Sequence, residues 1–410
     1  MNAEFGAFAG SHVLAEFDGI DSELLDSPEA LETLLHTTLT DAGATVCGVV
    51  SHRFEPQGVT VLAMLAESHA SIHTYPERGS AFADVFTCGH RADPRRAVEL
   101  MSAALGAATT RTTIVPRGLE QPRLLREPVG DGLVRSWQLD EVLFETDTDF
   151  QNVVIGKTAQ GISLFCDAER QSTEATQLIY HEALMMPGFL LADQLDRVLI
   201  IGSSEGVASQ LSVAAGATIV DHVDIDTAAV RACAEYLPYG YTRTELAAAE
   251  AGEGPIRVHY RDGWEFLAEA AAGNTRYDLV VIDLPDENDD PDAQHNRLYG
   301  TEFLERCAAV TRTGGVVATQ AGCPTVWRNQ TLLQAWQRWT DMFGTVAYFG
   351  SDEHEWAFFA ARVDPITDHT EKMVRRLETL PYQPKTMDAE TVRASAVPPY
   401  SLRSRPRARA

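Results

Sequence analysis

The sequence predicts an α+β two-layer sandwich at the N-terminus, followed by a small β-meander and a doubly wound α/β domain. Three observations lead to this fold class. Residues 1–120 alternate short β-rich runs with two helical patterns, residues 132–175 contain short alternating segments, and continuous apolar runs alternate with helical stretches after Pro187. The length of 410 residues also exceeds the roughly 250–300 residues over which one hydrophobic core usually extends.

Two helix starts and several β-rich runs define the N-terminal domain. Ser27 precedes Pro28 and Asp93 precedes Pro94, and such pairs are typical of an N-cap followed by proline in the first turn. Leucines at helical spacing follow the first pair up to Gly43. The β-rich runs are TVCGVVSHRF (45–54), VTVLAMLAES (59–68) and FADVFTC (82–88). We expect helices on one face of an antiparallel sheet.

Buried strands alternate with helical segments in the second half of the chain. The strands expected there are RVLIIG (197–202), TIVDHVDID (218–226), YDLVVIDLP (277–285) and GGVVATQAG (314–322). Continuous apolar strands separated by helices indicate a parallel sheet. The domain boundaries expected from these patterns are 1–120, a linker at 121–135, a β-rich part at 136–190, the α/β domain at 191–380, and a tail at 381–410 with a disordered end.

Composition excludes several classes of protein. The formal net charge of −26 argues against nucleic-acid binding, because phosphate contacts need clustered Lys and Arg. The N-terminus does not read as a secretory signal, and no apolar run reaches the roughly 18 residues of a membrane helix. Six cysteines without CxxC spacing argue against a zinc site or a disulfide framework. We therefore expect a cytoplasmic protein that binds no metal, nucleic acid or membrane.

The most informative stretch of the first domain is LAESHASIHTYPERGSAFADVFTCG (65–89). Residues 8–118 resemble the bacterial and archaeal S-adenosylmethionine decarboxylase family, whose hallmark is ESHxxIHTxPE followed by DVFTCG. Removing a carboxylate from an amino acid needs an electron sink that no ordinary side chain provides. The resemblance implies that the chain makes this sink itself. Cleavage between Glu67 and Ser68 would convert Ser68 into a pyruvoyl group, whose ketone forms a Schiff base with the substrate.

The resemblance also assigns roles to three further residues of this domain. His73 would assist backbone cleavage, Cys88 would protonate the decarboxylated carbon, and Phe54 would stack on adenine. Ser68 and His73 are five residues apart, so an unbroken strand would place them on opposite faces, and we expect a bend between them. The motif reports on cofactor formation and leaves ornithine or arginine open as alternative substrates.

Residues 136–363 resemble the spermidine synthase family of polyamine aminopropyltransferases. The matching segments, in family order, are FQNVVI (150–155), SLFCDAERQSTEATQLIYHEAL (163–184), RVLIIGSSEGV (197–207), VDID (223–226), RDGWEFL (261–267), YDLVVIDLPD (277–286), LYGTEF (298–303) and GGVVATQAGCP (314–324). The resemblance implies a Rossmann-like, methyltransferase-type domain that uses decarboxylated S-adenosylmethionine as co-substrate.

An adenosyl ligand is indicated by the residues that follow the first two parallel strands. Asp224 lies 22 residues beyond Gly202, where an acidic residue can bind ribose hydroxyls. By resemblance, Asp262 contacts the adenine edge. These features alone would suit a methyltransferase equally well. The Asp283-Leu-Pro-Asp286 sequence favours an aminopropyltransferase, because one carboxylate can take up an amine proton while the other anchors a cationic acceptor.

The remaining roles in the second domain come from the resemblance. Asp283 would be the base and Asp286 the acceptor anchor, Tyr180 and His181 would line the acceptor region, and the donor contacts would be Gln151, Gln171 and Glu205. Two departures from the family pattern stand out. The usual Gly-Gly-Gly-Asp-Gly is Gly202-Ser-Ser-Glu-Gly206, and the usual PTYPSG near the last strand is replaced by YFGSDEHEW (348–356), which removes a tyrosine that grips the acceptor.

The primary hypothesis is a bifunctional enzyme of polyamine biosynthesis. Its first domain would decarboxylate S-adenosylmethionine, and its second would transfer the aminopropyl group to a diamine, putrescine, giving spermidine and methylthioadenosine. One alternative makes the first domain an ornithine or arginine decarboxylase that supplies the acceptor. Another makes one domain a silent regulatory module. Both resemblances imply a homo-oligomer, and the decarboxylase family builds its site across a dimer interface.

Overall fold

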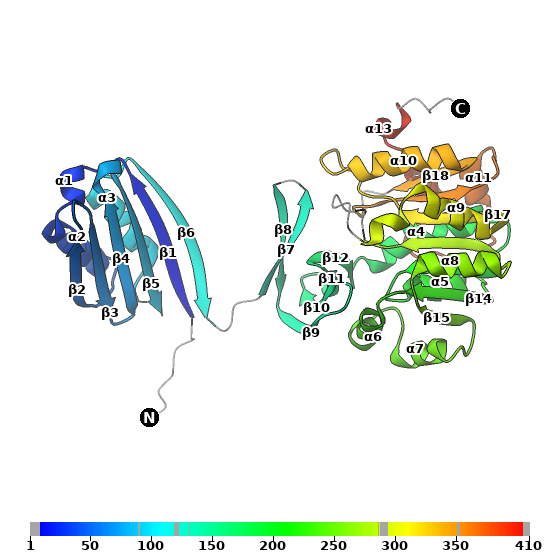
Figure 1. The fold of residues 1–410 in the computed structure, drawn as a ribbon, viewed down its shortest axis with the longest axis horizontal. Helices are drawn as coiled ribbons and strands as arrows, with labels where there is room; N and C mark the ends of the chain where they lie inside the picture. Colours follow the sequence, from blue (N-terminus) through cyan, green and yellow to red (C-terminus); the bar gives the residue numbers. More distant parts are fainter. Residues whose placement is uncertain are drawn as a thin grey trace. The chain divides into compact units, whose positions relative to one another are not determined.

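The computed structural model describes residues 9–88, 91–118, 123–130, 132–285, 287, 294–350 and 353–404. The chain divides into two compact units, Met1–Pro122 and Arg123–Ala410, and each is described by itself (Figure 1). No helix within these described ranges is long and apolar enough to cross a membrane.

The first unit contains one antiparallel sheet with the strand order β2-β3-β4-β5-β1-β6. Its elements are β1 (Ala9–Asp18), α1 (Ser22–Leu25), α2 (Pro28–Asp41), β2 (Val46–Arg53), β3 (Val59–Leu65), β4 (Ser68–Tyr75), η1 (Pro76–Arg78), β5 (Ser80–Cys88), α3 (Pro94–Leu105) and β6 (Thr109–Gly118). Ser27 and Asp93 cap α2 and α3 as predicted, each accepting a hydrogen bond from a backbone N–H of the first turn.

The helices α2 and α3 pack on one face of this sheet and leave the other face open (Figure 1). Successive residues of a strand point to opposite faces, so one set of alternating residues is buried and the other is not. In β4, Ala70 and Ile72 are buried in the core. The open face carries large apolar side chains, among them Leu62 and Met64 of β3 and Phe82 of β5, which are 51%, 61% and 49% exposed.

The second unit begins with two small antiparallel sheets. These are a hairpin of β7 (Arg123–Gly130) and β8 (Leu133–Leu139), and a meander of β9 (Glu141–Asp147), β10 (Asn152–Thr158), β11 (Gly161–Cys166) and β12 (Glu169–Thr173). The expectation of a linker over 121–135 was wrong from residue 123 onward. The hairpin is packed rather than free, because Leu125 and Leu139 share a core with Val154 and Phe165 of the meander.

A seven-stranded sheet forms the body of the second unit, in the order β15-β14-β13-β16-β17-β19-β18. Its strands are β13 (Arg197–Gly202), β14 (Ile219–Asp224), β15 (Ile256–Tyr260), β16 (Tyr277–Asp283), β17 (Thr311–Gln320), β18 (Thr345–Gly350) and β19 (Ala357–Arg362). The first five are parallel, and β18 and β19 are antiparallel additions. The strand order reverses between β13 and β16, where ligands bind in open α/β sheets.

Helices cover both faces of this sheet, and two separate cores result. The helices and the remaining short element are α4 (Gln177–Leu191), α5 (Val207–Ala214), α6 (Thr227–Tyr236), α7 (Arg243–Glu250), α8 (Gly263–Ala272), η2 (Gln294–Leu298), α9 (Thr301–Val310), α10 (Gln330–Met342), α11 (His369–Leu377), α12 (Ala389–Ser395) and α13 (Tyr400–Arg403). The segment set apart as a tail belongs to this fold up to α13, because Val392 and Leu402 are buried in the two cores. Residues 405–410, for which disorder was expected, lie outside the described part.

Glu182 of α4 fastens the C-terminal segment to the body of the second unit. Its fully buried carboxylate accepts hydrogen bonds from the hydroxyl groups of Tyr382 and Thr386 and from the backbone N–H groups of Lys385 and Thr386. Removing one partner of a buried charged network leaves the others unsatisfied, which is strongly destabilising.

We therefore expect Glu182→Ala to lower the free energy of unfolding of the second unit by about 3 kcal/mol. All six tryptophans lie in that unit, so a urea titration followed by tryptophan fluorescence reports on it alone. Glu378→Ala removes an exposed carboxylate nearby and serves as the matched control. Equal unfolding midpoints for the two variants would contradict the role given to Glu182.

Candidate functional site

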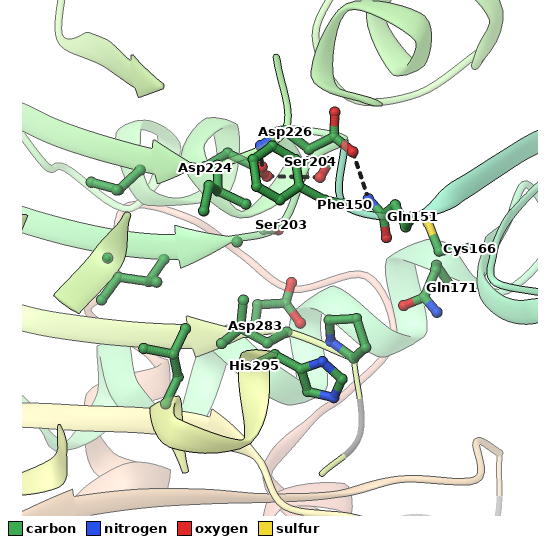
Figure 2. Close-up of a pocket in the computed structure, with 18 of the residues that line it drawn as sticks. Phe150, Gln151, Cys166, Gln171, Ser203, Ser204, Asp224, Asp226, Asp283 and His295 are labelled. Atoms are coloured by element: carbon green, nitrogen blue, oxygen red, sulfur yellow. Dashed lines mark hydrogen bonds between the residues drawn. The ribbon is translucent and has the colours of Figure 1, made fainter. Parts of the chain in front are cut away.

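The carboxyl ends of the parallel strands surround one cavity of about 390 Å³ (Figure 2). Gly202 ends β13, Asp224 ends β14, Asp262 follows β15 and Asp283 ends β16. Parallel strands end at the same edge of a sheet, so these four positions meet although they are spread over residues 202–283. The meander contributes the opposite wall of the cavity through residues such as Gln171.

Gly202 allows the turn after β13 to lie against the end of β16. Its φ of +85° is one that residues with a side chain rarely adopt, and an added Cβ would lie 2.0 Å from the carbonyl oxygen of Asp283. The backbone N–H of Ser203 donates to that same carbonyl over 2.9 Å. A glycine is therefore required here, and it brings the turn beside the carboxyl group of Asp283.

Asp224 is held by two donors on the floor of the cavity. The Ser204 hydroxyl donates to Oδ2 over 2.7 Å, and the backbone N–H of Asp226 donates to Oδ1 over 2.8 Å (Figure 2). Burial raises the pKa of Asp224 to about 6, and the charges of Asp226 and Glu205 act in the same direction. Near neutral pH this carboxylate remains an acceptor for ligand hydroxyls.

Asp283 has the features of a general base. The Tyr180 hydroxyl donates to its Oδ1 over 2.7 Å. Burial raises the pKa of Asp283, and the nearby Glu205 carboxylate raises it further, while His181 and the Tyr180 hydrogen bond oppose the shift. A carboxylate with a raised pKa binds a proton more strongly and so removes one more effectively from an amine.

The other predicted residues of this site take different positions. Gln151 and Gln171 line the cavity, and the Gln151 amide donates to Asp226 over 3.0 Å. Asp262 lines it too, while capping α8 and pairing with Arg297. His181 is not among the lining residues. Its ring is buried, with Nδ1 2.7 Å from the Gln177 carbonyl and Nε2 without a partner. Asp286 lies outside the described residues.

Several cavity residues were missed by the sequence analysis, among them Phe150, Cys166, Asp226, His295 and Arg297. A signal existed for Asp226, because it follows Asp224 by two residues in the same segment, and for Phe150, because it immediately precedes Gln151. The other three carried none, since only the folded chain brings Cys166 and η2 to the edge of the sheet.

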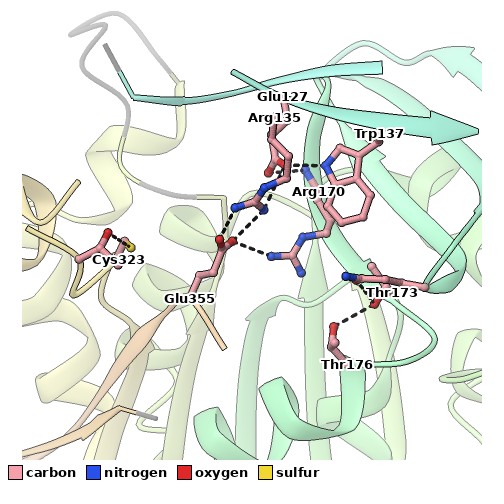
Figure 3. Close-up of polar contacts among 10 residues, drawn as sticks. Glu127, Arg135, Trp137, Arg170, Thr173, Thr176, Cys323 and Glu355 are labelled. Carbon is pink, nitrogen blue, oxygen red and sulfur yellow. Dashed lines mark hydrogen bonds and ion pairs between the residues drawn. The ribbon is translucent and has the colours of Figure 1, made fainter. Parts of the chain in front are cut away.

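A second cavity, of about 270 Å³, shares Tyr180 with the first. Its wall is an ion-pair cluster in which Arg135 of the hairpin and Arg170 of the meander both reach Glu355 (Figure 3). Arg170 also lies over the Trp356 ring, 4.7 Å from its centroid. Glu355 and Trp356 belong to the segment that replaces the expected PTYPSG, so this wall is where the chain departs from the family pattern.

The predicted cleavage point of the first unit lies at the turn between β3 and β4. The Glu67 carbonyl accepts a hydrogen bond from the Cys88 backbone N–H over 3.1 Å, and the Glu67 carboxylate accepts from the Thr45 N–H and hydroxyl, both over 3.0 Å. The Thr45 hydrogen bonds lower the pKa of Glu67. Ser68 follows this turn at the first position of β4, beside Thr87 of β5. The turn therefore brings Glu67, Ser68 and Cys88 together.

His73 does not join that group. The expectation of a bend between Ser68 and His73 was wrong, because β4 is unbroken and its pairing with β5 runs in register from Ser68 to Tyr75. Five residues of strand separate the two by roughly 17 Å. His73 instead lies beside Phe54 and Tyr75, with Nδ1 2.5 Å from the Thr60 hydroxyl. The predicted site residues of the first unit therefore form two separate groups, one around Ser68 and one around His73.

Comparisons with known proteins match the two units to two families. Residues 11–118 match the S-adenosylmethionine decarboxylase family, and residues 177–349 match the spermine/spermidine synthase domain. The S-adenosylmethionine decarboxylase proenzyme of Caldicellulosiruptor saccharolyticus is 46% identical over 114 residues, which is 28% of this chain and 92% of the relative. The corresponding proenzyme of Prochlorococcus marinus is 50% identical over 98 residues, 24% of this chain and 78% of the relative.

Solved structures show the fold of the second unit. A spermidine synthase in complex with the transition-state analogue AdoDATO superposes with a TM-score of 0.58 at 18% identity, covering 69% of this chain and 95% of the other. The spermidine synthase of Thermotoga maritima gives 0.56 at 17% identity, covering 69% and 94%. With these matches, the chain belongs through its first unit to the S-adenosylmethionine decarboxylase proenzyme family, fused to a spermine/spermidine synthase domain.

Proposed function

We propose that the chain decarboxylates S-adenosylmethionine in its first unit and, in its second, transfers the aminopropyl group of the product to putrescine. The two family matches make it a bifunctional enzyme of polyamine biosynthesis, and they give no support to ornithine or arginine as the decarboxylase substrate or to a silent domain. The observation that carries the proposal is the presence in one chain of a turn fitted for cleavage at Ser68 and a cavity with a half-buried base of raised pKa, Asp283.

In the first unit, cleavage after Glu67 would convert Ser68 into a pyruvoyl group. That group supplies the electron sink that decarboxylation requires. The residues around it fit this use. Cys88 is exposed and lies on the neighbouring strand, with its backbone N–H on the Glu67 carbonyl, which supports the proposal that its thiol returns a proton to the decarboxylated carbon. Phe54 is 40% exposed and offers an aromatic face to an adenine ring.

In the second unit, the cavity would hold decarboxylated S-adenosylmethionine. Asp224 would accept hydrogen bonds from the ribose hydroxyls and Asp262 would meet the adenine edge, while Gln151, Gln171 and Glu205 would contact the aminopropyl arm. Asp224 and Glu205 are buried and Asp283 is half-buried at one edge of the sheet, which favours a ligand with positive charge at the sulfonium and the amine. The support for this assignment is that burial raises the pKa of Asp224 and Asp283, because a cation beside them would stabilise their charged forms.

The acceptor amine would be deprotonated by Asp283 and would attack the propyl carbon next to the sulfonium. The proton passes to Asp283, the new C–N bond forms, and the C–S bond breaks to release methylthioadenosine. Tyr180 orients the Asp283 carboxylate through their hydrogen bond. The Nε2 atom of His181, which has no hydrogen-bond partner, is one further acceptor near Asp283. Asp286 would anchor the far ammonium of putrescine.

We also propose that the first unit works as a homo-oligomer joined through its open sheet face. Large apolar side chains on that face are about half exposed, including Leu62, Met64 and Phe82. Ser68 and His73 lie on the same strand but far apart, so one copy alone does not bring them together. A second copy packed on this face would supply His73 to the Ser68 of the first.

The coupled activity is tested with purified protein, S-adenosylmethionine and putrescine, and mass detection of products. We expect spermidine from wild type, together with two chain fragments, 1–67 and 68–410, the larger lighter by one ammonia than a simple hydrolysis product. Ser68→Ala should remain uncut and make spermidine only when decarboxylated donor is added. Asp283→Asn should be cut normally but transfer at least about 100-fold more slowly, because the base is lost.

The two variants serve as controls for each other, since each removes one activity and spares the other. An uncut wild-type chain would contradict the decarboxylase assignment. Wild type that is cut but makes spermidine only with added decarboxylated donor would contradict S-adenosylmethionine as its substrate.

The shared site is tested by co-expressing full-length Ser68→Ala and His73→Ala chains that carry different tags. If His73 acts on the Ser68 of a partner, a mixed dimer has one intact site, made of Ser68 from the His73→Ala chain and His73 from the Ser68→Ala chain. When equal amounts of the two chains pair at random, about half of the His73→Ala chains enter mixed dimers and should be cut. His73→Ala expressed alone should remain uncut. Equal absence of cutting in both preparations would show that the two residues do not act across copies.

A further inference from the structure

Beside the Ser68 hydroxyl lies His69, the next residue of the chain. The Nδ1 atom of His69 is 3.2 Å from the Ser68 Oγ. We infer that His69 is the base that takes the Ser68 proton in the first step of self-cleavage. This inference rests on the proposed conversion of Ser68 and deepens it.

His69 is held in place by side chains on two neighbouring strands. Its Nε2 is 3.5 Å from Oδ2 of Asp84 on β5, and the same oxygen is 3.2 Å from Nε2 of His12 on β1. Ser71 donates to the other oxygen of Asp84, and Arg117 lies 3.5 Å from Nδ1 of His12. The Asp84 carboxylate favours the tautomer with the proton on Nε2, which leaves Nδ1 free to accept from Ser68, and it stabilises the imidazolium that forms.

The Glu67 carbonyl that Ser68 would attack already accepts a hydrogen bond. The Glu67 oxygen accepts the Cys88 backbone N–H over 3.1 Å, and a donor in that position stabilises the negative charge that develops there during attack. The nucleophile, the base, the group that orients the base and the oxyanion donor therefore all come from one copy of the chain. They repeat the functional parts of a serine–histidine–aspartate site.

All atoms and protons are conserved in the first step of self-cleavage. The Ser68 Oγ proton passes to His69 Nδ1 while Oγ bonds to the Glu67 carbonyl carbon. The bond between that carbon and the Ser68 nitrogen breaks, and the proton returns from His69 to this nitrogen. The products are an ester between Glu67 and the Ser68 side chain and a free Ser68 amine. Nothing is oxidised or reduced, and no co-reactant is consumed.

His69 and His73 belong to the same motif but have different roles in this proposal. His73 lies five residues along β4, beside Thr60 and far from the Ser68 of its own copy. Ester formation therefore depends on His69 within one copy. Any contribution of His73 comes from a second copy or after the ester has formed.

The test follows cleavage of full-length proenzyme after pulsed synthesis. His69→Ala should be cut at least about 100-fold more slowly than wild type, which is the usual loss when a general base is removed. Added imidazole should restore part of the rate, because His69 is 54% exposed and its vacated place is accessible. Hydroxylamine cleaves esters. It should not split uncut His69→Ala, because the ester between Glu67 and the Ser68 side chain has not formed in that variant. His36→Ala, on the exposed side of α2, should be cut like wild type.

Asp84 is a positioning residue in this proposal, so its removal should change the rate of cleavage only through its effect on His69. Asp84→Asn should slow cleavage, and the double variant with His69→Ala should be no slower than His69→Ala alone, whereas independent effects would multiply. Circular dichroism of each uncut protein verifies that it has folded.

Three results would overturn the inference while wild type is still cut after Glu67. These are cleavage of His69→Ala within about threefold of wild type, splitting of that variant by hydroxylamine, and loss of wild-type cleavage in EDTA. The last would mean that His12, His69 and Asp84, whose ligand atoms lie within 4.8 Å of one another, act through a bound metal. A wild-type chain that is never cut there would instead remove the proposed function, and this inference with it.

Discussion

The second unit is organised around carboxyl groups that are held out of water. Asp224 ends β14 and Asp283 ends β16, the two strands that flank β13, and Glu205 lies in the turn after β13. Burial and the charge of Glu205 raise the pKa of both aspartates. The protein retains such an arrangement at the expense of its own stability, and a cation bound in the cavity would relieve the repulsion. The need to place these groups explains the glycine at 202 and the hydrogen bonds from Ser204 and Tyr180.

In the first unit, the residues of the proposed site belong to a single antiparallel sheet. The period of two along β4 sends Ala70 and Ile72 into the core and leaves His69, Ser71 and His73 on the open face. The same alternation therefore builds the core and displays the reactive side chains. The long, regular register also keeps Ser68 and His73 apart, which is why we propose His69 as the nearby base and a second copy of the chain as the source of His73.

Local signals in the sequence were sufficient for much of the fold. Ser27 and Asp93 predicted the starts of two helices, because an N-cap is a local interaction. The buried strands of the parallel sheet were predicted from continuous apolar runs. The first strand of the hairpin, β7, was missed because it is polar on one side and contains proline and glycine. At the sites, motif positions gave Ser68 and Asp283, whereas the proximity of His69 to Asp84 depends on strand pairing that no local pattern reveals.

The importance of the buried carboxyl groups can be measured as a difference between two ligands. Titration calorimetry would compare decarboxylated S-adenosylmethionine, which carries a sulfonium and an ammonium charge, with the thioether that remains when its sulfonium methyl is removed and that keeps the ammonium charge alone. At pH 8 the sulfonium ligand should bind at least about tenfold more tightly, or about 1.4 kcal/mol. Because the pKa of Asp224 is raised to about 6, the preference should shrink as pH falls below 6 and this group becomes neutral, and the raised pKa of Asp283 acts in the same direction. Equal affinities at pH 8, or a preference that grows at lower pH, would contradict a cavity built for a cation.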